Sequence, residues 1–281
     1  ALLGLLLSTA LALKAAQFLF YPWLLDAMEA PVPISAQLHS STLVIIGFYV
    51  YLRLLPLFQQ STIVQTTLLA WGLATVVGAS CLGFFQEDGK RLLACSTASQ
   101  LGYVVVGLSL GLVEESVLLL VFCCCNKAFT FVLFGVLMDK CAGISDFRMI
   151  GGQTSLRWAE HAFVAVAVAN FTVAPGAFSW HVKALFSRGY ADLEGWLPRL
   201  GLDVLSLTWF FSSLYLVYLY QMLFLRPSRA GQRAYGQTLV GRSAWPSSGT
   251  LGYSQARAGV SSSFFVVIAL THLCLLATPG L

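Results

Sequence analysis

Long apolar runs separated by short polar segments make up most of the chain. Runs of about twenty apolar residues are typical of helices that span a bilayer, whereas the strands of a membrane barrel are about ten residues long and alternate in polarity. We therefore expect an all-α membrane protein with roughly eight transmembrane helices. The runs cover residues 1–25, 41–58, 63–85, 92–113, 116–138, 161–186, 205–225 and 262–278.

Proline and glycine interrupt two of these regions. Pro22, Pro31 and Pro33 close the first run, and Pro175 with Gly176 lies inside the sixth. Proline removes a backbone donor, so a break at membrane depth needs protein or water to satisfy the freed groups. Paired broken helices are typical of ion paths in transporters. We predict broken helices between Pro22 and Pro33 and at Pro175 and Gly176, with ordinary proline kinks as the alternative.

Composition narrows the class of protein. Apolar residues make up 58% of the 281 and charged residues only 10%, with a mean hydropathy of +0.79. Soluble domains are about 25% charged, so a soluble globular protein is excluded, and 13% aromatic residues exclude a disordered one. The net charge of +4 includes five arginines in the polar Arg/Gly/Ser segment 226–259, which form no dense patch and do not indicate nucleic-acid binding.

The seven cysteines show no spacing typical of a metal site or a disulfide framework, and three of them, Cys123 to Cys125, are consecutive. No phosphate-binding glycine loop or nucleophile motif is present. We therefore expect no metal, no cofactor and no redox site on this chain. Residues 1–13 could pass for the core of a signal peptide, but they lack a basic start and Lys14 follows directly, which favours a spanning helix.

The few basic residues inside the apolar runs are the candidate functional residues. Lys127 lies eleven residues from either end of its run, and Lys14 is also interior; His39 follows the first proline break, and His181 and Lys183 follow the second. A lysine at mid-bilayer costs about 2.5–3.5 kcal/mol on insertion scales. Desolvation favours its neutral form, so it can exchange protons, as histidine already does. We predict a proton relay through these five residues, with structural hydrogen bonds between helices as the alternative.

All twelve acidic residues lie in loops, at breaks or at the ends of runs. No run has a central carboxylate, although a buried lysine without a partner is unfavourable. Either Asp26 or Glu29 therefore folds back towards Lys14, or another chain supplies the carboxylate.

Several strings resemble a known family. KAAQFLFYPWLLDAMEAPVPISAQLHSSTLVIIGFYVYLRL, residues 14–54, resembles the family of NADH dehydrogenase subunit 5, the distal antiporter-like membrane subunit of respiratory complex I. DGKRLLACSTASQLGY at 88–103, DFRMIGG at 146–152 and FSSLYLVYLYQMLFL further on are similar to other strings of that family. The resemblance is strong up to Gly152 and weaker afterwards. We therefore expect two parts: antiporter-like helices with relay residues at 1–152 and a divergent second part at 153–281.

The resemblance implies roles for matched residues of the first part. Lys14 matches the buried lysine of the family's first broken helix, which pairs with a glutamate from an earlier helix, and His39 matches the relay histidine. Lys127 matches the histidine of the H-A-F-F-K-A motif, whereas the lysine of that motif aligns with Phe131. The family's preceding histidine aligns with Cys123 and is lost.

In the second broken helix the family reads G-F-x-S-K-D, whereas this chain reads GAFSWHVK. The exit lysine of the family therefore aligns with Trp180, and its acid with His181. Lys183, one helical turn away, could take the place of the lysine.

The resemblance implies a multi-pass subunit of the mitochondrial inner membrane that takes part in proton translocation coupled to quinone reduction in NADH:ubiquinone oxidoreductase, complex I. NADH, FMN, iron–sulfur clusters and ubiquinone would bind to other subunits. The partners implied are other membrane-arm subunits and the lipid bilayer. Because the family's first helices have no counterpart here, we expect a shortened or split subunit, with a separate chain supplying the carboxylate partner of Lys14.

Two alternatives stay open. One is a structural membrane scaffold of the complex with a degenerate proton path. The other is a subunit of a related cation/proton antiporter or membrane hydrogenase.

Overall fold

The computed structural model describes residues 2–40, 42–140, 145–146, 178–191 and 196–220. The chain divides into two compact units, residues 1–227 and 228–281. All described residues belong to the first unit. The predicted proline break at Pro175 and Gly176, the eighth apolar run and the polar segment 226–259 lie outside them.

The described residues form helices and no strand, apart from one isolated bridge between Asp88 and Asp146. Four helical segments are long and apolar enough to cross a membrane: Val32–Gln59, Thr62–Phe85, Gly89–Ser109 and Val113–Met138. The prediction of an all-α membrane protein is confirmed. The helices are α1 (Leu2–Lys14), α2 (Pro22–Asp26), the 3-10 helix η1 (Ala27–Glu29), α3 (Val32–Ser40), α4 (Leu43–Gln59), α5 (Thr62–Phe85), α6 (Gly89–Ser109), α7 (Val113–Lys140), α9 (Phe178–Ala191) and α10 (Trp196–Tyr220).

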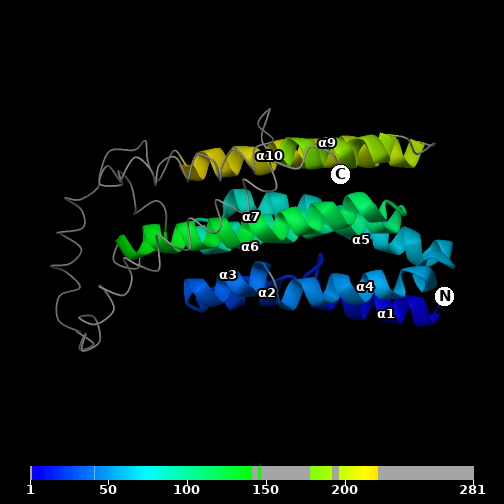
Figure 1. Cartoon of the computed structure of the whole chain (residues 1–281), viewed down its shortest axis with the longest axis horizontal. Helices are drawn as coiled ribbons and strands as arrows, with labels where there is room; N and C mark the ends of the chain where they lie inside the picture. The colour runs from blue at the N-terminus through cyan, green and yellow to red at the C-terminus, as the bar shows by residue number, and fades with distance from the viewer. Residues whose placement is uncertain (1, 41, 141–144, 147–177, 192–195, 221–281) are drawn as a thin grey trace. The chain divides into compact units, whose positions relative to one another are not determined.

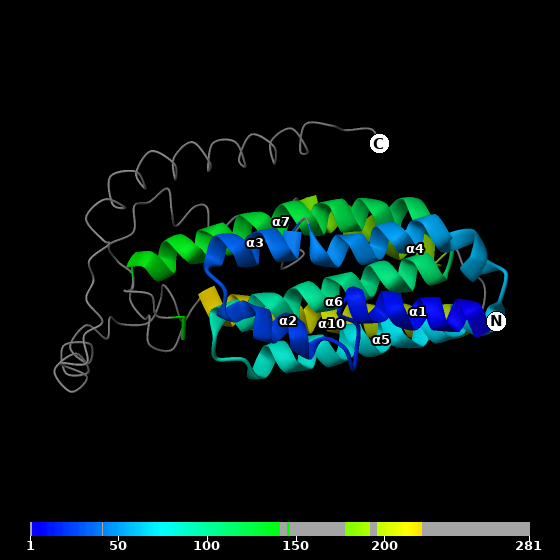
Figure 2. The same ribbon diagram turned by 90° about the horizontal axis from the view of Figure 1, so that it is seen from below.

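Helices α1 to α7 run roughly parallel to one another, with α1 packed on α4 and α3 on α7 (Figures 1 and 2). α6 lies at the centre, since it contacts both α5 and α7 and its residues from Leu92 to Ser109 are all buried. A helix that is buried on every side can carry polar residues only where a neighbour satisfies them. The polar side chains of α6 are therefore the natural inner wall of a site.

The first predicted break is present, but it begins earlier than expected. α1 ends at Lys14, Ala16 and Leu19 have positive φ angles of 50° and 76°, and α2 begins at Pro22. Proline fits the first turn of a helix because its missing N–H would have no partner there. Pro22 thus starts a helix rather than ending one. The amide of Phe18 in the break donates to Thr75 Oγ1 of α5 at 2.8 Å, which satisfies one freed group.

The second apolar run also starts earlier than predicted. A short helix, α3, precedes α4 and forms with it one broken span, Val32–Gln59. The prediction missed α3 because Ser35, Gln37 and His39 lower its hydropathy below that of the following run. His39 therefore lies at the end of a half-helix that faces the bundle interior, not in a loop.

Glycine allows α5 and α6 to pack closely. A Cβ on Gly102 would lie 2.8 Å from Val76 Cγ2 and 3.0 Å from the carbonyl oxygen of Gly72. A Cβ on Gly72 would in turn lie 3.2 Å from the carbonyl oxygen of Gly102. Backbone atoms cannot move aside as a side chain can, so both positions need glycine, as in the small-residue interfaces of membrane helices.

Candidate functional site

Lys127 is completely buried near the middle of α7. Its ammonium donates to the hydroxyl of Ser96 on α6 in a short hydrogen bond. It also interacts electrostatically with Cys95 and Cys123 and with Lys183 of α9. Lys127 is therefore buried within the bundle, while its role in proton transfer stays a prediction.

His39, 2% exposed, faces α7 from the end of α3. Its ring stacks on that of Phe131 with centroids 4.8 Å apart, and it interacts electrostatically with Lys127. Neither ring nitrogen has a hydrogen-bond partner among the described residues. Buried polar atoms in native proteins are nearly always hydrogen-bonded, so the partners of these two nitrogens are expected outside the described residues.

A constant register joins α6 to α7 around these residues. Ser96 meets Lys127, and one turn further the thiol of Cys123 donates to Gln100 Oε1 at 3.0 Å. The residue numbers of both pairs have the same sum, as expected for antiparallel neighbours. Gly89 with Phe134 and Gly107 with Ser116 continue the same register towards the two ends.

Lys183 enters the interior from α9. It is 3% exposed, and its ammonium lies 5.5 Å from the centre of the Trp209 ring on α10. Tyr103 of α6 flanks the same indole with centroids 5.5 Å apart, and its hydroxyl shares a 2.6 Å hydrogen bond with Thr208. The aromatic face therefore gives this cation one favourable partner.

The structure brings three of the five predicted residues together and leaves two apart. His39, Lys127 and Lys183 form one buried cluster, linked by the interactions given above. Lys14 is exposed at the end of α1, and His181 is exposed on α9. The burial that the family resemblance implies for Lys14 is not seen among the described residues, and its role in the relay stays a prediction.

Several polar residues of the site were not predicted. Ser96 and Gln100 are one turn apart on α6, as Cys123 and Lys127 are on α7, and this matched spacing was a usable signal. The amide of Asn126, fully buried, has no hydrogen-bond partner in the part of the chain described, and neither has the hydroxyl of Ser179. The interior is thus richer in polar groups than its charges alone suggest.

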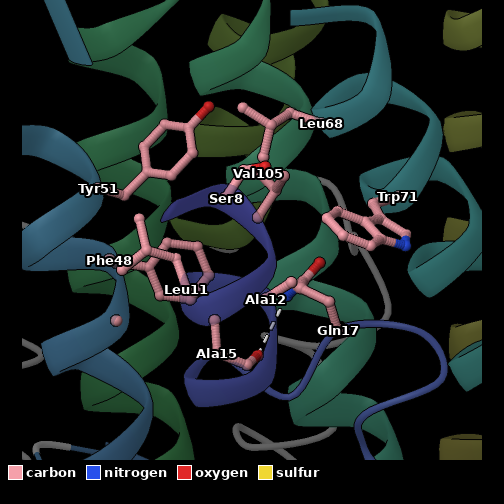
Figure 3. A pocket seen from close by; sticks show the side chains of 11 residues that line it. Ser8, Leu11, Ala12, Ala15, Gln17, Phe48, Tyr51, Leu68, Trp71 and Val105 are labelled. Carbon is pink, nitrogen blue, oxygen red and sulfur yellow. Dashed lines mark hydrogen bonds between the residues drawn. The ribbon is translucent and has the colours of Figure 1, made fainter. Parts of the chain in front are cut away.

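A separate pocket lies between α1, α4, α5 and α6 (Figure 3). The cavity has a volume of only about 10 Å³ and is lined almost entirely by apolar side chains, with Ser8 and Gln17 as polar members. Gln17 donates to the carbonyl of Ala15 at 3.1 Å. None of the predicted relay residues is among its lining residues, so it does not belong to the cluster around Lys127.

No group of three or more His, Cys, Asp or Glu side chains that could hold a metal occurs among the residues the structure describes. The basic cluster instead combines a buried lysine with a histidine on a broken span and a second lysine on another helix. Such an arrangement is typical of ion paths through helical membrane proteins.

The chain belongs to the transmembrane family of NADH:quinone oxidoreductase and Mrp antiporter subunits, whose model matches residues 1–185. NADH-ubiquinone oxidoreductase chain 5 of Halichoerus grypus is 39% identical over 153 residues, which cover 54% of this chain and 24% of that protein. Its counterpart in Talaromyces marneffei is 32% identical over 184 residues, or 66% and 28% of the two chains. The chain thus spans about a quarter of the length of these relatives.

Two solved structures share the fold. The Mrp complex from Dietzia sp. DQ12-45-1b matches with a TM-score of 0.72 and 24% identity, over 79% of this chain and 25% of that one. The membrane-bound sulfane sulfur reductase, an archaeal respiratory membrane complex, matches with a TM-score of 0.68 and 18% identity, over 95% and 54%. At these identities they establish the antiporter-like fold alone.

Proposed function

We propose that this chain takes part in proton translocation coupled to quinone reduction, as an antiporter-like membrane-arm subunit of NADH:ubiquinone oxidoreductase. Family membership and the relatives named chain 5 support the assignment. The observation that carries it is Lys127, fully buried at mid-helix and interacting with both His39 and Lys183. An ionisable group at this depth is costly, which marks it as functional.

The proposed mechanism is electrostatic. Ser96 accepts a hydrogen bond from the Lys127 ammonium, and its own hydroxyl donates to the carbonyl oxygen of Leu93 at 2.8 Å. Like charges repel strongly in a low dielectric, so a proton that arrives on His39 disfavours one on Lys127, and the same holds between Lys127 and Lys183. Charge changes elsewhere in the assembly would move protons along the cluster. Water hydrogen-bonded to the unpartnered nitrogens of His39 would bridge the first step.

Lys14 and His181 would exchange protons at the two outer ends of the same path. Their exposure supports contact with groups outside the described residues. For Lys14 we propose a carboxylate from a neighbouring chain, which the prediction of a separate chain also requires. The other partners would be membrane-arm subunits of complex I in the mitochondrial inner membrane, and NADH, FMN, iron–sulfur clusters and ubiquinone would bind to those other subunits.

A structural scaffold is the second candidate function, and Phe131 favours it. This ring is fully buried and stacks on His39, in the position where the family resemblance places a lysine. An aromatic ring cannot carry a proton, so a dry contact here would leave His39 isolated from the rest of the path.

Substitution of Lys127 by Met separates the two candidates. Loss of a proton-transfer group slows the step it serves by about 10²–10⁴-fold, so protons moved per NADH oxidised should fall in sealed vesicles that contain the assembled complex. Assembly and NADH oxidation with an uncoupler should persist. Arg53→Met is the matched control, because Arg53 is an exposed cation on α4 held by Tyr49. A normal proton yield in Lys127→Met would favour the scaffold.

A further inference from the structure

The junction between η1 and α3 is held by a lysine from another helix. η1 ends at Glu29, Ala30 is extended with φ −63° and ψ 155°, and α3 begins at Val32. Lys90, in the first turn of α6, donates from its ammonium to the carbonyl oxygens of Ala30 at 3.1 Å and Met28 at 3.4 Å. Both acceptors lie where the chain leaves one helical segment for the next.

These carbonyls need a donor because a break in a helix frees backbone acceptors that no amide of the same helix can reach. The Ala30 carbonyl also accepts a 3.3 Å hydrogen bond from the hydroxyl of Ser35, a residue on the first turn of α3. One charged donor and one local hydroxyl therefore meet on the same oxygen. The junction and the start of α3 are tied to α6 at a single point.

Lys90 is itself fixed at its base. Its amide donates to Asp88 Oδ1 at 2.9 Å, the N-cap of α6, and Asp88 Oδ2 accepts from the Ser145 hydroxyl at 2.9 Å. The preceding amide, that of Gly89, donates to the Ser145 carbonyl at 3.1 Å. Lys90 thus extends from a capped helix end that is hydrogen-bonded to Ser145.

We propose that Lys90 is a positioning residue, which holds the Met28–Ala30 junction so that α3 presents His39 to Phe131 and Lys127. α3 has only nine residues, so the placement of its first turn determines where His39 lies at its end. α6 also carries Ser96, the partner of Lys127. One helix therefore sets both sides of the buried cluster. The functional consequence rests on the proposed function, whereas the structural one does not.

The test compares Lys90→Met with Lys90→Arg and Arg91→Met in the full-length chain within its purified membrane assembly. Arg91→Met is the matched control, because it removes one positive charge from the same helical turn and Arg91 is exposed. Lys90→Met should speed hydrogen exchange of the α3 amides, such as those of Ile34 and Ser35, by about tenfold. Exchange in α5 should stay the same, and Lys90→Arg should restore protection, because it keeps a donor at the junction.

The two proposals fail in different ways. If α3 exchange in Lys90→Met equals that of the wild type or of Arg91→Met, the positioning role is refuted, whatever the proton yield. Faster exchange in Lys90→Met with rescue by Lys90→Arg supports it. If His39→Ala leaves the proton yield per NADH unchanged, the relay fails, while the positioning role still stands on the exchange data.

Discussion

At the scale of single residues, the pair of Lys183 and Trp209 shows how an aromatic face helps to stabilise a buried cation. The ammonium lies 5.5 Å from the ring centre, at 3% exposure. Contacts of this kind contribute about 0.5–2 kcal/mol, with the larger value for desolvated sites. Trp209 Nε1 has no hydrogen-bond partner among the described residues, so the contribution of the indole comes from its face.

Trp209→Leu should therefore lower the free energy of unfolding by about 1 kcal/mol more than Trp209→Phe does, because phenylalanine keeps an aromatic face. Neither variant removes a hydrogen bond among the described residues. Thermal unfolding of the two purified variants in detergent measures the difference. The same comparison in a Lys183→Met background is the control, and there the difference should shrink to what packing against Tyr103 contributes. If the Leu and Phe variants of Trp209 unfold at the same temperature in the chain that keeps Lys183, the cation–π contact contributes nothing.

Sequence reasoning located the residues of the site better than their partners. Lys127 stands out because it is a lone cation far from both ends of an apolar run, and burial follows from that position. The partnership of Lys183 with Trp209 could not be predicted, since it depends on how α9 packs against α10. The surroundings of Lys14 could not be predicted for a related reason: it is interior along its run, but among the described residues it is exposed at the end of α1.

At the scale of elements, the apolar pattern predicted the bounds of α5, α6 and α7 to within a few residues. It did not predict the short helix α3, which turns polar residues towards the bundle. The half-helix α3 was missed because its buried face is polar: Ser35 and His39 are 0% and 2% exposed. Hydropathy records the preference of a residue for lipid, whereas these side chains face protein. The polar register between α6 and α7 was hidden in the same way.

Close packing of α5 on α6 gives a prediction at this scale. Gly102→Ala should destabilise the chain by about 1–3 kcal/mol, because its Cβ would meet the Gly72 carbonyl at 3.0 Å and Val76 at 2.8 Å. Gly83→Ala on α5 is the matched control, since its Cβ would make only ordinary contacts of 3.4 Å or more. Detergent unfolding curves compare the two variants, and equal midpoints would contradict close backbone contact.

At the scale of the whole molecule, α1 has two distinct faces. Its inner face carries small or buried residues and packs on α4 and α5, with Gly4 against Val64. Its other face is apolar and exposed, and Lys14 lies beside it at the helix end. The exposed leucines are Leu2, Leu3, Leu6 and Leu13.

A face of this kind in a membrane can contact lipid or another helix, but a lysine beside it within the apolar region needs an anionic partner. Asp26 and Glu29 are exposed, and no ion pair to Lys14 is formed among the described residues. We therefore expect a map of the assembled complex to show a carboxylate from another segment within about 4 Å of Lys14 Nζ. Lys14→Met should reduce the proton yield per NADH while assembly persists, and Arg53→Met should not. If only lipid or solvent surrounds Lys14 in such a map, the proposed partner does not exist, and a normal yield in Lys14→Met would confine the proton path to His39, Lys127 and Lys183.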